Sequence, residues 1–204
     1  LYIHYSQGTA LKRSSYNSVN YMHFSIDEEQ YLKSKLAEAD KAFWLKKLHD
    51  YPPMLKLPIN NPRPRIQSHQ AQIVNFHIEK RELEKLKDFC TKNSVQFSSL
   101  CLTAYFILLS RYSNQDEIIV GMPLNIRPSQ AYENVLGYFV NTLPIFEKNI
   151  SNLKVHDLLA NVNDGVILAH KHKRFPIMNL AKELDFSRDL SIAPLYQALF
   201  TFQQ

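Results

Sequence analysis

Glycine is scarce in this sequence, and its scarcity narrows the range of functions. Only 4 of the 204 residues are glycine, which argues against Gly-rich phosphate loops and against an all-β fold with many tight turns. Neither G-x-G-x-x-G nor G-x-x-x-x-G-K-[ST] occurs, and the G-x-S-x-G nucleophile elbow is also absent. These absences leave little support for nucleotide binding or for a serine hydrolase of that kind.

Cysteines and long apolar runs are also few. Cys90 and Cys101 lie in apolar helical stretches without metal-ligand spacing, so we expect buried thiols in a reducing compartment. The longest apolar run, around Leu100 to Leu109, is about half the length that spans a bilayer. No signal peptide opens the chain. The sequence therefore predicts a soluble, cytoplasmic protein without a membrane partner.

The eight histidines form no metal-binding pattern. His170 and His172 are two residues apart, which on a helix puts them on different faces, so we expect no metal site. The stretch from His23 to Asp27 spells H-x-x-x-D, the core of an acyltransferase motif. Glu28 stands where that motif has Gly, and Asp27 lies where a helix begins, so we favour a structural interpretation.

The net charge is a mild +5, from 24 Lys and Arg against 19 Asp and Glu. The basic residues gather once, in the run from His170 to Arg174. We interpret this run mainly as a solvated helix end, where cations complement the helix dipole. An acidic protein partner is an alternative. Nucleic acid is not expected, because no aromatic-plus-basic signature occurs.

The N-terminal third reads as a helical lead-in segment. Apolar spacing predicts one long helix from about Glu28 to His49, and Ser25 with Glu28 has the spacing of a capping box. Five prolines between Tyr51 and Arg65 predict an irregular linker. We therefore divide the chain into residues 1–65, a helical segment with a Pro-rich linker, and residues 66–204, a compact body.

The body alternates strand and helix patterns, which predicts an α/β layer fold. In chain order, we expect a strand at 74–78, a helix at 83–90, a buried helix at 98–112, a short strand at 118–120 ended by Gly121 and Pro123, a strand at 139–145, a helix at 155–162, a short helix at 176–184 and a last strand at 195–202.

Several segments resemble the condensation domains of nonribosomal peptide synthetases. Residues 137–144 read G-Y-F-V-N-T-L-P and match the family's G-x-F-V-N-T-L motif without a break. Further similarities in the same order are Tyr21 and Phe24 to the start of Y-x-D-F, residues 116–127 to D-x-x-x-G-x-P-x-x-x-R with one additional residue between Asp116 and Gly121, His172 and Pro176 to H-x-x-x-P, and residues 188–195 to R-D-x-S-x-x-P-L.

The resemblance is accompanied by departures that leave the subtype open. The departing residues are His23 for Asp, Asp27 for Trp, Phe146 for a frequent Arg, Ile177 and Met178 for Phe and Glu, and Ile192 and Ala193 for Arg and Asn. The family's catalytic H-H-x-x-x-D-G is expected shortly before Leu1. By resemblance, this chain is the C-terminal lobe of a condensation domain, incomplete at its C-terminus.

The resemblance implies a chloramphenicol-acetyltransferase-like lobe, with a mixed sheet and packed helices. Two such lobes enclose a tunnel in which an aminoacyl amine attacks an acyl or peptidyl thioester. The implied partners are carrier proteins with their phosphopantetheine arms and the N-terminal lobe; no cofactor is bound directly. Self-association of the fragment is a further expectation. A non-catalytic docking lobe, or an epimerisation, cyclisation or free-standing acyltransferase domain, remains an alternative.

The resemblance also supplies site residues, none of them catalytic. The candidates for lining the tunnel are Gly137, Tyr138, Asn141 and Thr142. Asn141 either faces the tunnel or satisfies buried backbone groups, Thr142 on the opposite face is more structural, and Gly137 permits a turn. The structural candidates, with Arg127, Arg188 and Asp189 expected in internal ion pairs, are Arg127, His172, Pro176, Arg188, Asp189, Ser191 and Pro194.

Overall fold

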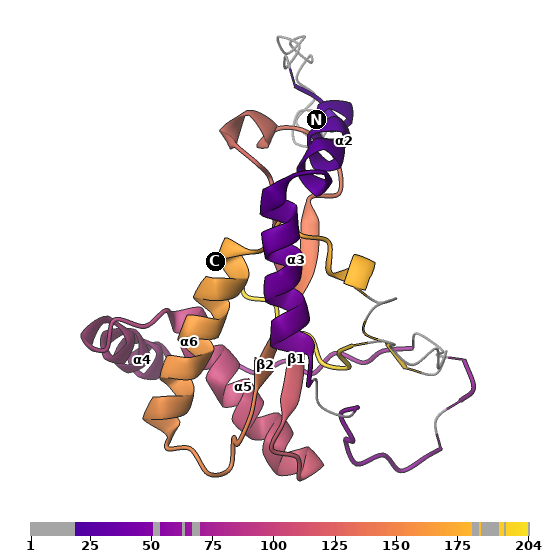
Figure 1. Cartoon of the computed structure of the whole chain (residues 1–204). Helices are drawn as coiled ribbons and strands as arrows, with labels where there is room; N and C mark the ends of the chain where they lie inside the picture. The colour runs from indigo at the N-terminus through magenta and orange to yellow at the C-terminus, as the bar shows by residue number, and fades with distance from the viewer. Residues whose placement is uncertain are drawn as a thin grey trace, which may run out of the picture.

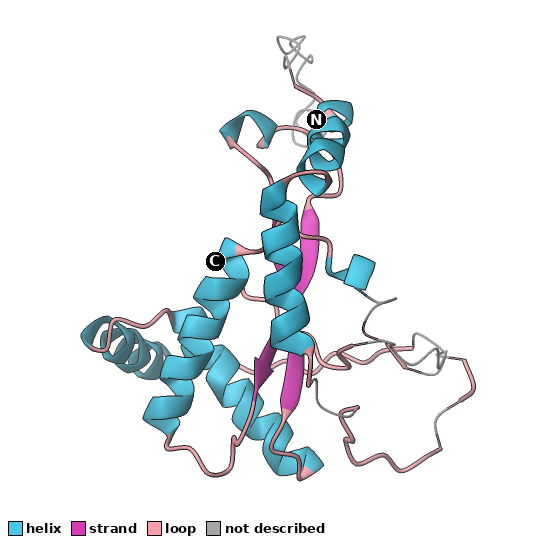
Figure 2. Cartoon of the chain, viewed as in Figure 1, coloured by secondary structure: helices cyan, strands magenta, loops and turns pink. Residues whose placement is uncertain are grey.

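A computed structural model describes residues 19–50, 54–62, 64–66, 70–180, 184, 192–193 and 195–203. Helices surround a narrow antiparallel sheet (Figures 1 and 2). The elements in chain order are α2 (Tyr21–Leu32), α3 (Lys35–Leu48), α4 (Lys80–Lys92), α5 (Phe97–Ser113), β1 (Ile118–Asn125), η1 (Gln130–Tyr132), β2 (Val140–Glu147), α6 (Val155–Lys171) and η2 (Ile177–Leu180).

The sheet pairs β1 with β2 from Ile118 opposite Glu147 to Asn125 opposite Val140. A third segment adds to the free side of β1 through an isolated parallel bridge between Gly121 and Leu199. The Gly121 N–H donates to Ala198 O at 2.9 Å, and the Phe200 N–H donates to Gly121 O at 2.9 Å. The predicted last strand at 195–202 is therefore present only as this bridge within the described residues.

The prediction that Gly121 and Pro123 end the first strand is wrong, since β1 continues to Asn125. The N–H and C=O groups of Gly121 bond to the 198–200 segment. Gly121 and its partner Pro144 on β2 are therefore a pair without hydrogen bonds between them. Pro144 and Pro123 therefore forfeit no bond between β1 and β2. Gly121 is also required for space, because a Cβ there would lie 2.7 Å from the Tyr196 ring.

Three helices cover the sheet and close one hydrophobic core. Helix α5 packs on β1, and α6 packs on β2 and on α5. Figure 1 shows α3 crossing in front of the two strands, and its Trp44 and Leu48 are fully buried in the same cluster as Val120 and Leu143. Helix α3 thus shares the core of the body, while the division of the chain at residue 65 stays a prediction.

The predicted long helix at 28–49 is two helices, α2 and α3, separated at Lys33 and Ser34. Helix α2 begins earlier than predicted, at Tyr21, with the Asn20 side chain accepting from the N–H groups of Met22 and His23. Ser34 caps α3 by accepting from the Ala37 N–H at 3.3 Å. The predicted capping box at Ser25 is wrong, because Ser25 lies inside α2 and donates to Tyr21 O.

The predicted strand at 74–78 is not formed. Residues 70–79 run without strand pairing (Figure 2), and Val74 and Phe76 are 86% and 79% exposed. Alternating apolar residues form a buried strand face only where neighbouring strands and a core are present. No described segment pairs with this one as a strand. The apolar side chains consequently face solvent.

The remaining helix predictions are confirmed with altered bounds by α4, α5 and α6. The predicted buried helix at 98–112 is buried only in part, since Leu108 and Tyr112 of α5 are exposed. The short helix after Pro176 is the 3-10 turn η2. Cys90 is buried and Cys101 partly buried, and both are free.

No single helix in the described part of the chain is long and apolar enough to cross a membrane. Helices α4 and α5 reach that length and composition only when taken together, and they are bent by 106° at the break between them.

Candidate functional site

A hollow of about 280 Å³ lies where four separate segments meet. One wall is α2, a second is the start of β2, a third is the segment after α6, and Tyr196 closes the fourth side. Tyr138, Asn141 and Thr142 all line this hollow, together with Pro176. The structure therefore brings together residues from motifs that are far apart in the sequence.

Asn141 holds the segment after α6 in place. Its Nδ2 donates to the carbonyls of Lys173 at 2.8 Å and Phe175 at 2.6 Å. The Asn141 side chain thus satisfies buried backbone carbonyls, which was one of its two predicted roles. It also lines the hollow. Two bonds from one amide fix the path of the segment that brings Arg174 and Pro176 to the hollow.

We call residues 172–176 the strap. Its first carbonyl, of His172, accepts from Trp44 Nε1 at 3.0 Å. Lys173 Nζ donates to Asn125 O at 2.7 Å. The interpretation of this basic run as a solvated helix end is therefore wrong beyond His170 and Lys171, because the residues that follow are bound to α3, β1 and β2.

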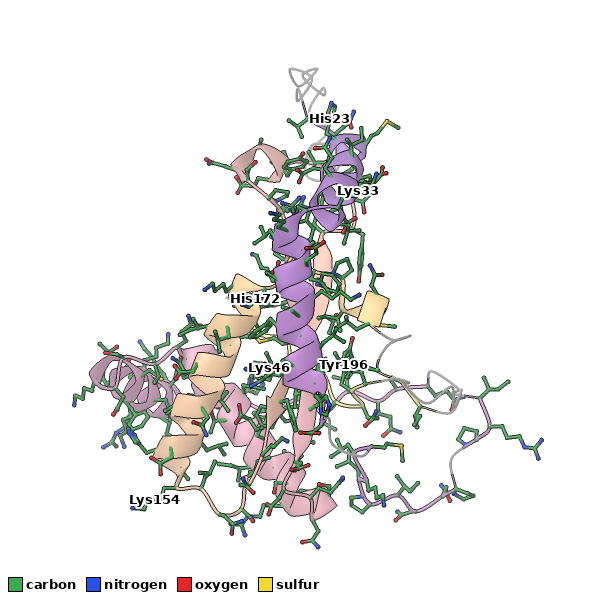
Figure 3. The ribbon with its side chains drawn as sticks, viewed as in Figure 1. His23, Lys33, Lys46, Lys154, His172 and Tyr196 are labelled. Carbon is green, nitrogen blue, oxygen red and sulfur yellow. The ribbon has the colours of Figure 1, made fainter. Side chains whose placement is uncertain are left out.

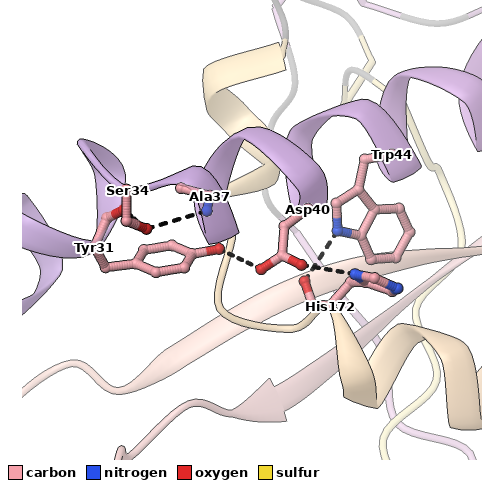
Figure 4. Close-up of polar contacts among 6 residues, drawn as sticks. All are labelled: Tyr31, Ser34, Ala37, Asp40, Trp44 and His172. Atoms are coloured by element: carbon pink, nitrogen blue, oxygen red, sulfur yellow. Dashed lines mark hydrogen bonds and ion pairs between the residues drawn. The ribbon is translucent and has the colours of Figure 1, made fainter.

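A buried carboxylate joins the strap to α2 and α3 (Figure 4). Asp40 is 4% exposed and accepts from the Tyr31 hydroxyl at 2.5 Å, and its other oxygen lies 2.7 Å from His172 Nδ1. The His172 ring also stacks on Phe43, with centroids 3.9 Å apart. Burial, the bond to Asp40 and the charge of that carboxylate raise the pKa of Tyr31. The predicted structural role of His172 is consistent with these contacts.

Arg174 is bound to α2 by charge and by stacking. One of its terminal nitrogens donates to Asp27 Oδ2 at 2.5 Å and to Asp27 O at 3.1 Å, and its guanidinium carbon lies 4.3 Å from the centre of the Tyr31 ring. Asp27 therefore serves as an ion-pair partner. His23 lies one turn earlier on α2, where its ring accepts from the Asn20 N–H, well apart from His172 (Figure 3).

Gly137, predicted to line the tunnel, is not among the residues that line the hollow, and its small size is required by Tyr21. A Cβ at Gly137 would lie 2.1 Å from Tyr21 Cδ2, whereas the prediction based its role on a turn. The Tyr21 hydroxyl donates to Tyr138 O at 3.1 Å. Tyr21 also packs edge-on against Phe139, so α2 is seated directly on the Gly137–Phe139 stretch.

Arg127 does not form the predicted ion pair within the described residues. Its Nη1 donates to the carbonyls of Tyr132 at 2.7 Å and Val135 at 3.0 Å. The guanidinium lies 3.9 Å from the centre of the Phe139 ring. Arg127 thus holds the 126–135 loop over the second, smaller core cluster of Phe24, Val135 and Phe139. The other motif residues, Arg188, Asp189, Ser191 and Pro194, lie outside the described residues.

Glu28, Arg174 and Tyr196 line the hollow although the sequence did not single them out as site residues. Tyr21, Phe24 and Glu28 are spaced by three and four, so a helical projection of α2 would have placed Glu28 beside the two motif residues. Tyr196 had no such local signal. Burial raises its pKa, although a hydrogen bond with Thr142 opposes the rise.

A second hollow, of about 710 Å³, lies between α3, the end of β2 and α6. Its floor includes Glu147, which is 6% exposed and has Oε1 3.5 Å from the position of a Cβ on Gly165. Burial raises the pKa of Glu147 to about 7, partly offset by Lys47. None of the predicted site residues that the structure describes lines this second hollow. Across the residues that the structure describes, no three His, Cys, Asp or Glu side chains are grouped for a metal ion.

Comparison with known proteins identifies the relatives of this chain. It is 34% identical over 183 residues to gramicidin S synthase 2 of Brevibacillus brevis, covering 90% of this chain and 4% of the synthase. It is also 31% identical over 186 residues to tyrocidine synthase 3 of Brevibacillus parabrevis, covering 91% of this chain and 3% of that synthase. The chain therefore spans a small part of the curated relatives it matches.

Solved condensation-domain structures share the fold. The X-domain from teicoplanin biosynthesis superposes with a TM-score of 0.83 at 21% identity, covering 96% of this chain and 44% of that one. The first condensation domain of the CDA synthetase gives 0.74 at 16% identity, covering 100% and 43%. The predicted chloramphenicol-acetyltransferase-like fold is thereby confirmed. The family model described as "Condensation domain" matches residues 1–204, and the chain belongs to the condensation-domain family of nonribosomal peptide synthetases.

Proposed function

We propose that this chain forms one wall of the substrate tunnel in a condensation domain that makes amide bonds between carrier-bound thioesters. The observation that carries the proposal is the convergence of three motif segments on one hollow. Tyr21, Tyr138, Asn141 and Pro176 come from segments up to 155 positions apart and all line it. Convergence of separate motifs on one concavity is typical of a binding site.

The proposed reaction needs two reactants to be held in line. The amine of an aminoacyl thioester attacks the carbonyl carbon of the donor thioester, a C–N bond forms, the C–S bond breaks, and the donor carrier's thiol is released. The amine gives up a proton to a base on the facing lobe. Fixing two tethered reactants in this orientation removes much of the entropic part of the barrier. Asn141 contributes by fixing the strap, which sets the shape of the hollow.

The proposal assigns catalysis to the facing lobe. The 204 residues contain no H-H-x-x-x-D-G stretch, so we expect no turnover by this chain alone. The proposed partners are that lobe and two carrier proteins, whose phosphopantetheine arms carry the substrates. Residues 1–65 would serve as the lead-in segment between the lobes, and residues 66–204 as the lobe itself.

Amide formation with purified loaded carriers tests the proposal. A complete domain containing these residues should yield the amide product, detected by mass spectrometry, and the 204-residue chain should not. Asn141→Ala in the complete domain should lower the yield at least tenfold, because the strap loses two bonds. The matched change Asn152→Ala, at an exposed loop position, should leave it unchanged. Product from the chain alone would contradict the assignment of catalysis.

A second candidate function, docking of carriers without chemistry, is favoured by the departures from the family motifs at Asp27, Ile177 and Met178. A chemical-shift titration with loaded and unloaded carriers separates the two. Binding that ignores the load, in a complete domain that makes no amide, would support docking. The intact F-V-N-T stretch at Phe139–Thr142 favours condensation over epimerisation or cyclisation.

A further inference from the structure

A carboxylate occupies an inward-facing position of α2. Tyr21, Phe24, Glu28 and Tyr31 follow one another at spacings of three and four, so they lie along one face of the helix. Phe24 and Tyr31 on this face are buried, and Glu28 lines the hollow of the candidate site. Glu28 is partly buried, and the helix-capping role predicted for it is ruled out by the true start of α2 at Tyr21.

The other charged groups nearby already have partners. Arg174 also lines the hollow, but its charge is directed at Asp27, with a nitrogen–oxygen distance of 2.5 Å. Glu29, the next residue of α2, is paired with Lys33 at 2.6 Å. Within the part of the chain that the structure describes, Glu28 has neither a hydrogen bond nor an ion pair within 4.0 Å. The hollow therefore carries one unmatched negative charge.

The chemistry of the hollow selects the kind of ligand. Its walls include apolar side chains such as Ile126 and Val140, beside the oxygen atoms of Thr142 and Tyr196. A carboxylate at a partly enclosed wall attracts a cation more strongly than one in open water. A ligand that brings a positive charge on a short apolar body therefore fits this hollow, whereas an anion is repelled.

We propose that Glu28 makes this hollow a binding site for a primary ammonium group on a carrier-bound amino acid. This inference rests on the proposed function, since it names what the tunnel wall recognises. The ammonium group is either the α-amine of the acceptor or a side-chain amine. Glu28 binds and orients the cation and accepts no proton from it; the facing lobe deprotonates the amine before attack.

Binding to the full 204-residue chain, followed by calorimetry and by amide chemical shifts, tests the assignment. The probes are stable amides of pantetheine with alanine, with Nα-acetyl-lysine and with N-acetylalanine, which carry an α-ammonium, a side-chain ammonium and no charge. Glu28→Gln should weaken the binding of whichever ammonium-bearing probe the chain prefers by about tenfold or more. The reason is that the bond from the ammonium group to the side chain no longer involves a charged acceptor. Glu29→Gln, on the solvent side of the same helix, is the matched control and should change nothing.

The outcomes separate the inference from the function on which it rests. Selective binding of the alanine probe would identify the α-amine as the source, and selective binding of the acetyl-lysine probe would identify the side chain. If all three probes bind alike, or if Glu28→Gln binds as the parent does, the ammonium site is overturned while the tunnel wall stands. If no probe binds to either protein, the ammonium site is overturned, while amide formation by the complete domain remains the separate test of the proposed function.

Discussion

His172 Nδ1 lies 2.7 Å from Asp40 Oδ1, joining two residues that are 132 positions apart. Asp40 is buried within α3, and His172 ends α6. Because the same carboxylate accepts from Tyr31 at the end of α2, one side chain connects three helices (Figure 4). The strap begins at this point, so the path toward the hollow depends on a residue that does not line it.

Replacing Asp40 should cost more stability than any exposed change on the same helix. Asp40→Ala leaves the buried Tyr31 hydroxyl and the partly buried His172 ring without an acceptor, and we expect a loss of about 3 kcal/mol in the free energy of unfolding. Asp40→Asn retains one acceptor and should lose about half as much. Urea denaturation measures both. Glu38→Gln, exposed on α3, is the control and should stay within about 0.5 kcal/mol; equal effects at the two positions would contradict the network.

Gly137→Ala should displace the Tyr21 ring. The added Cβ would lie 2.1 Å from Tyr21 Cδ2, and we expect a loss of about 2 kcal/mol. The cause is tested in a double-mutant cycle with Tyr21→Ala, which removes the ring that is struck. The alanine at 137 should then cost less than it does alone, whereas full additivity would mean that the backbone at Gly137, not the ring, sets the requirement.

Glu147 should make stability fall as the pH rises. Burial raises the pKa of this carboxyl from 4.5 to about 7, so its protonated form favours the folded state. Its contribution is fully present below pH 4.5 and is lost as the pH rises to about 7. Replacement by Gln removes this loss, so the variant should gain about 3 kcal/mol on the parent between pH 4 and pH 8.

Thermal or urea unfolding at several pH values measures this difference. Glu84→Gln, at an exposed position of α4, is the control and should follow the parent at every pH. Parallel pH profiles for Glu147→Gln and the parent would show that this carboxyl is ionised equally easily in the folded and unfolded chain. The charged neighbours that share the hollow with Glu147 are Lys46, Lys47, Asp50, Lys148 and Asp164.

Two serines of the lead-in helices should differ in their effect on stability. Ser34 accepts from the Ala37 N–H at the start of α3, and Ser34→Ala should cost about 1 kcal/mol. Ser25→Ala, at the position where the sequence predicted a cap, should change stability by less than about 0.5 kcal/mol. Chemical denaturation of both variants compares them directly, and the reverse order would restore the predicted capping box.

The 70–79 segment should promote self-association of the chain. Val74 and Phe76 are exposed, and their segment forms no strand pair with any described part of the chain, so a second copy can pair with it. Val74→Thr with Phe76→Ser should shift the mass measured by analytical ultracentrifugation toward the monomer. The control Leu136→Ser removes an apolar side chain outside this segment that is 85% exposed. An equal shift for this control would indicate nonspecific hydrophobic association.

Local periodicity predicted the elements whose pattern of apolar residues is complete within their own sequence. Helices α4, α5 and α6 and strand β2 were expected, because each carries its own apolar stripe or alternation. The break at Ser34 was missed since the apolar spacing runs on through it. The strand at 74–78 was predicted from alternation that has no partner strand in the described structure, and such pairing is not encoded locally.

The site was predictable only in part for a related reason. Motif residues Tyr138, Asn141 and Thr142 were found by resemblance and line the hollow. Arg174 is oriented by Asp27, 147 positions away, and Tyr196 arrives from the chain's last segment. No window of sequence contains both halves of such contacts, so these residues could be placed only in three dimensions.

The contacts of Trp44 and Asn141 with the strap have an evolutionary consequence. They bind the carbonyls of His172, Lys173 and Phe175, which every amino acid provides. These backbone bonds are therefore indifferent to the identity of residues 172, 173 and 175, although the side chains of Lys173 and Arg174 add bonds of their own. If the proposed function holds, a substitution at a residue that lines the hollow, such as Arg174, can change the chemistry of this wall while the backbone bonds of the strap remain available.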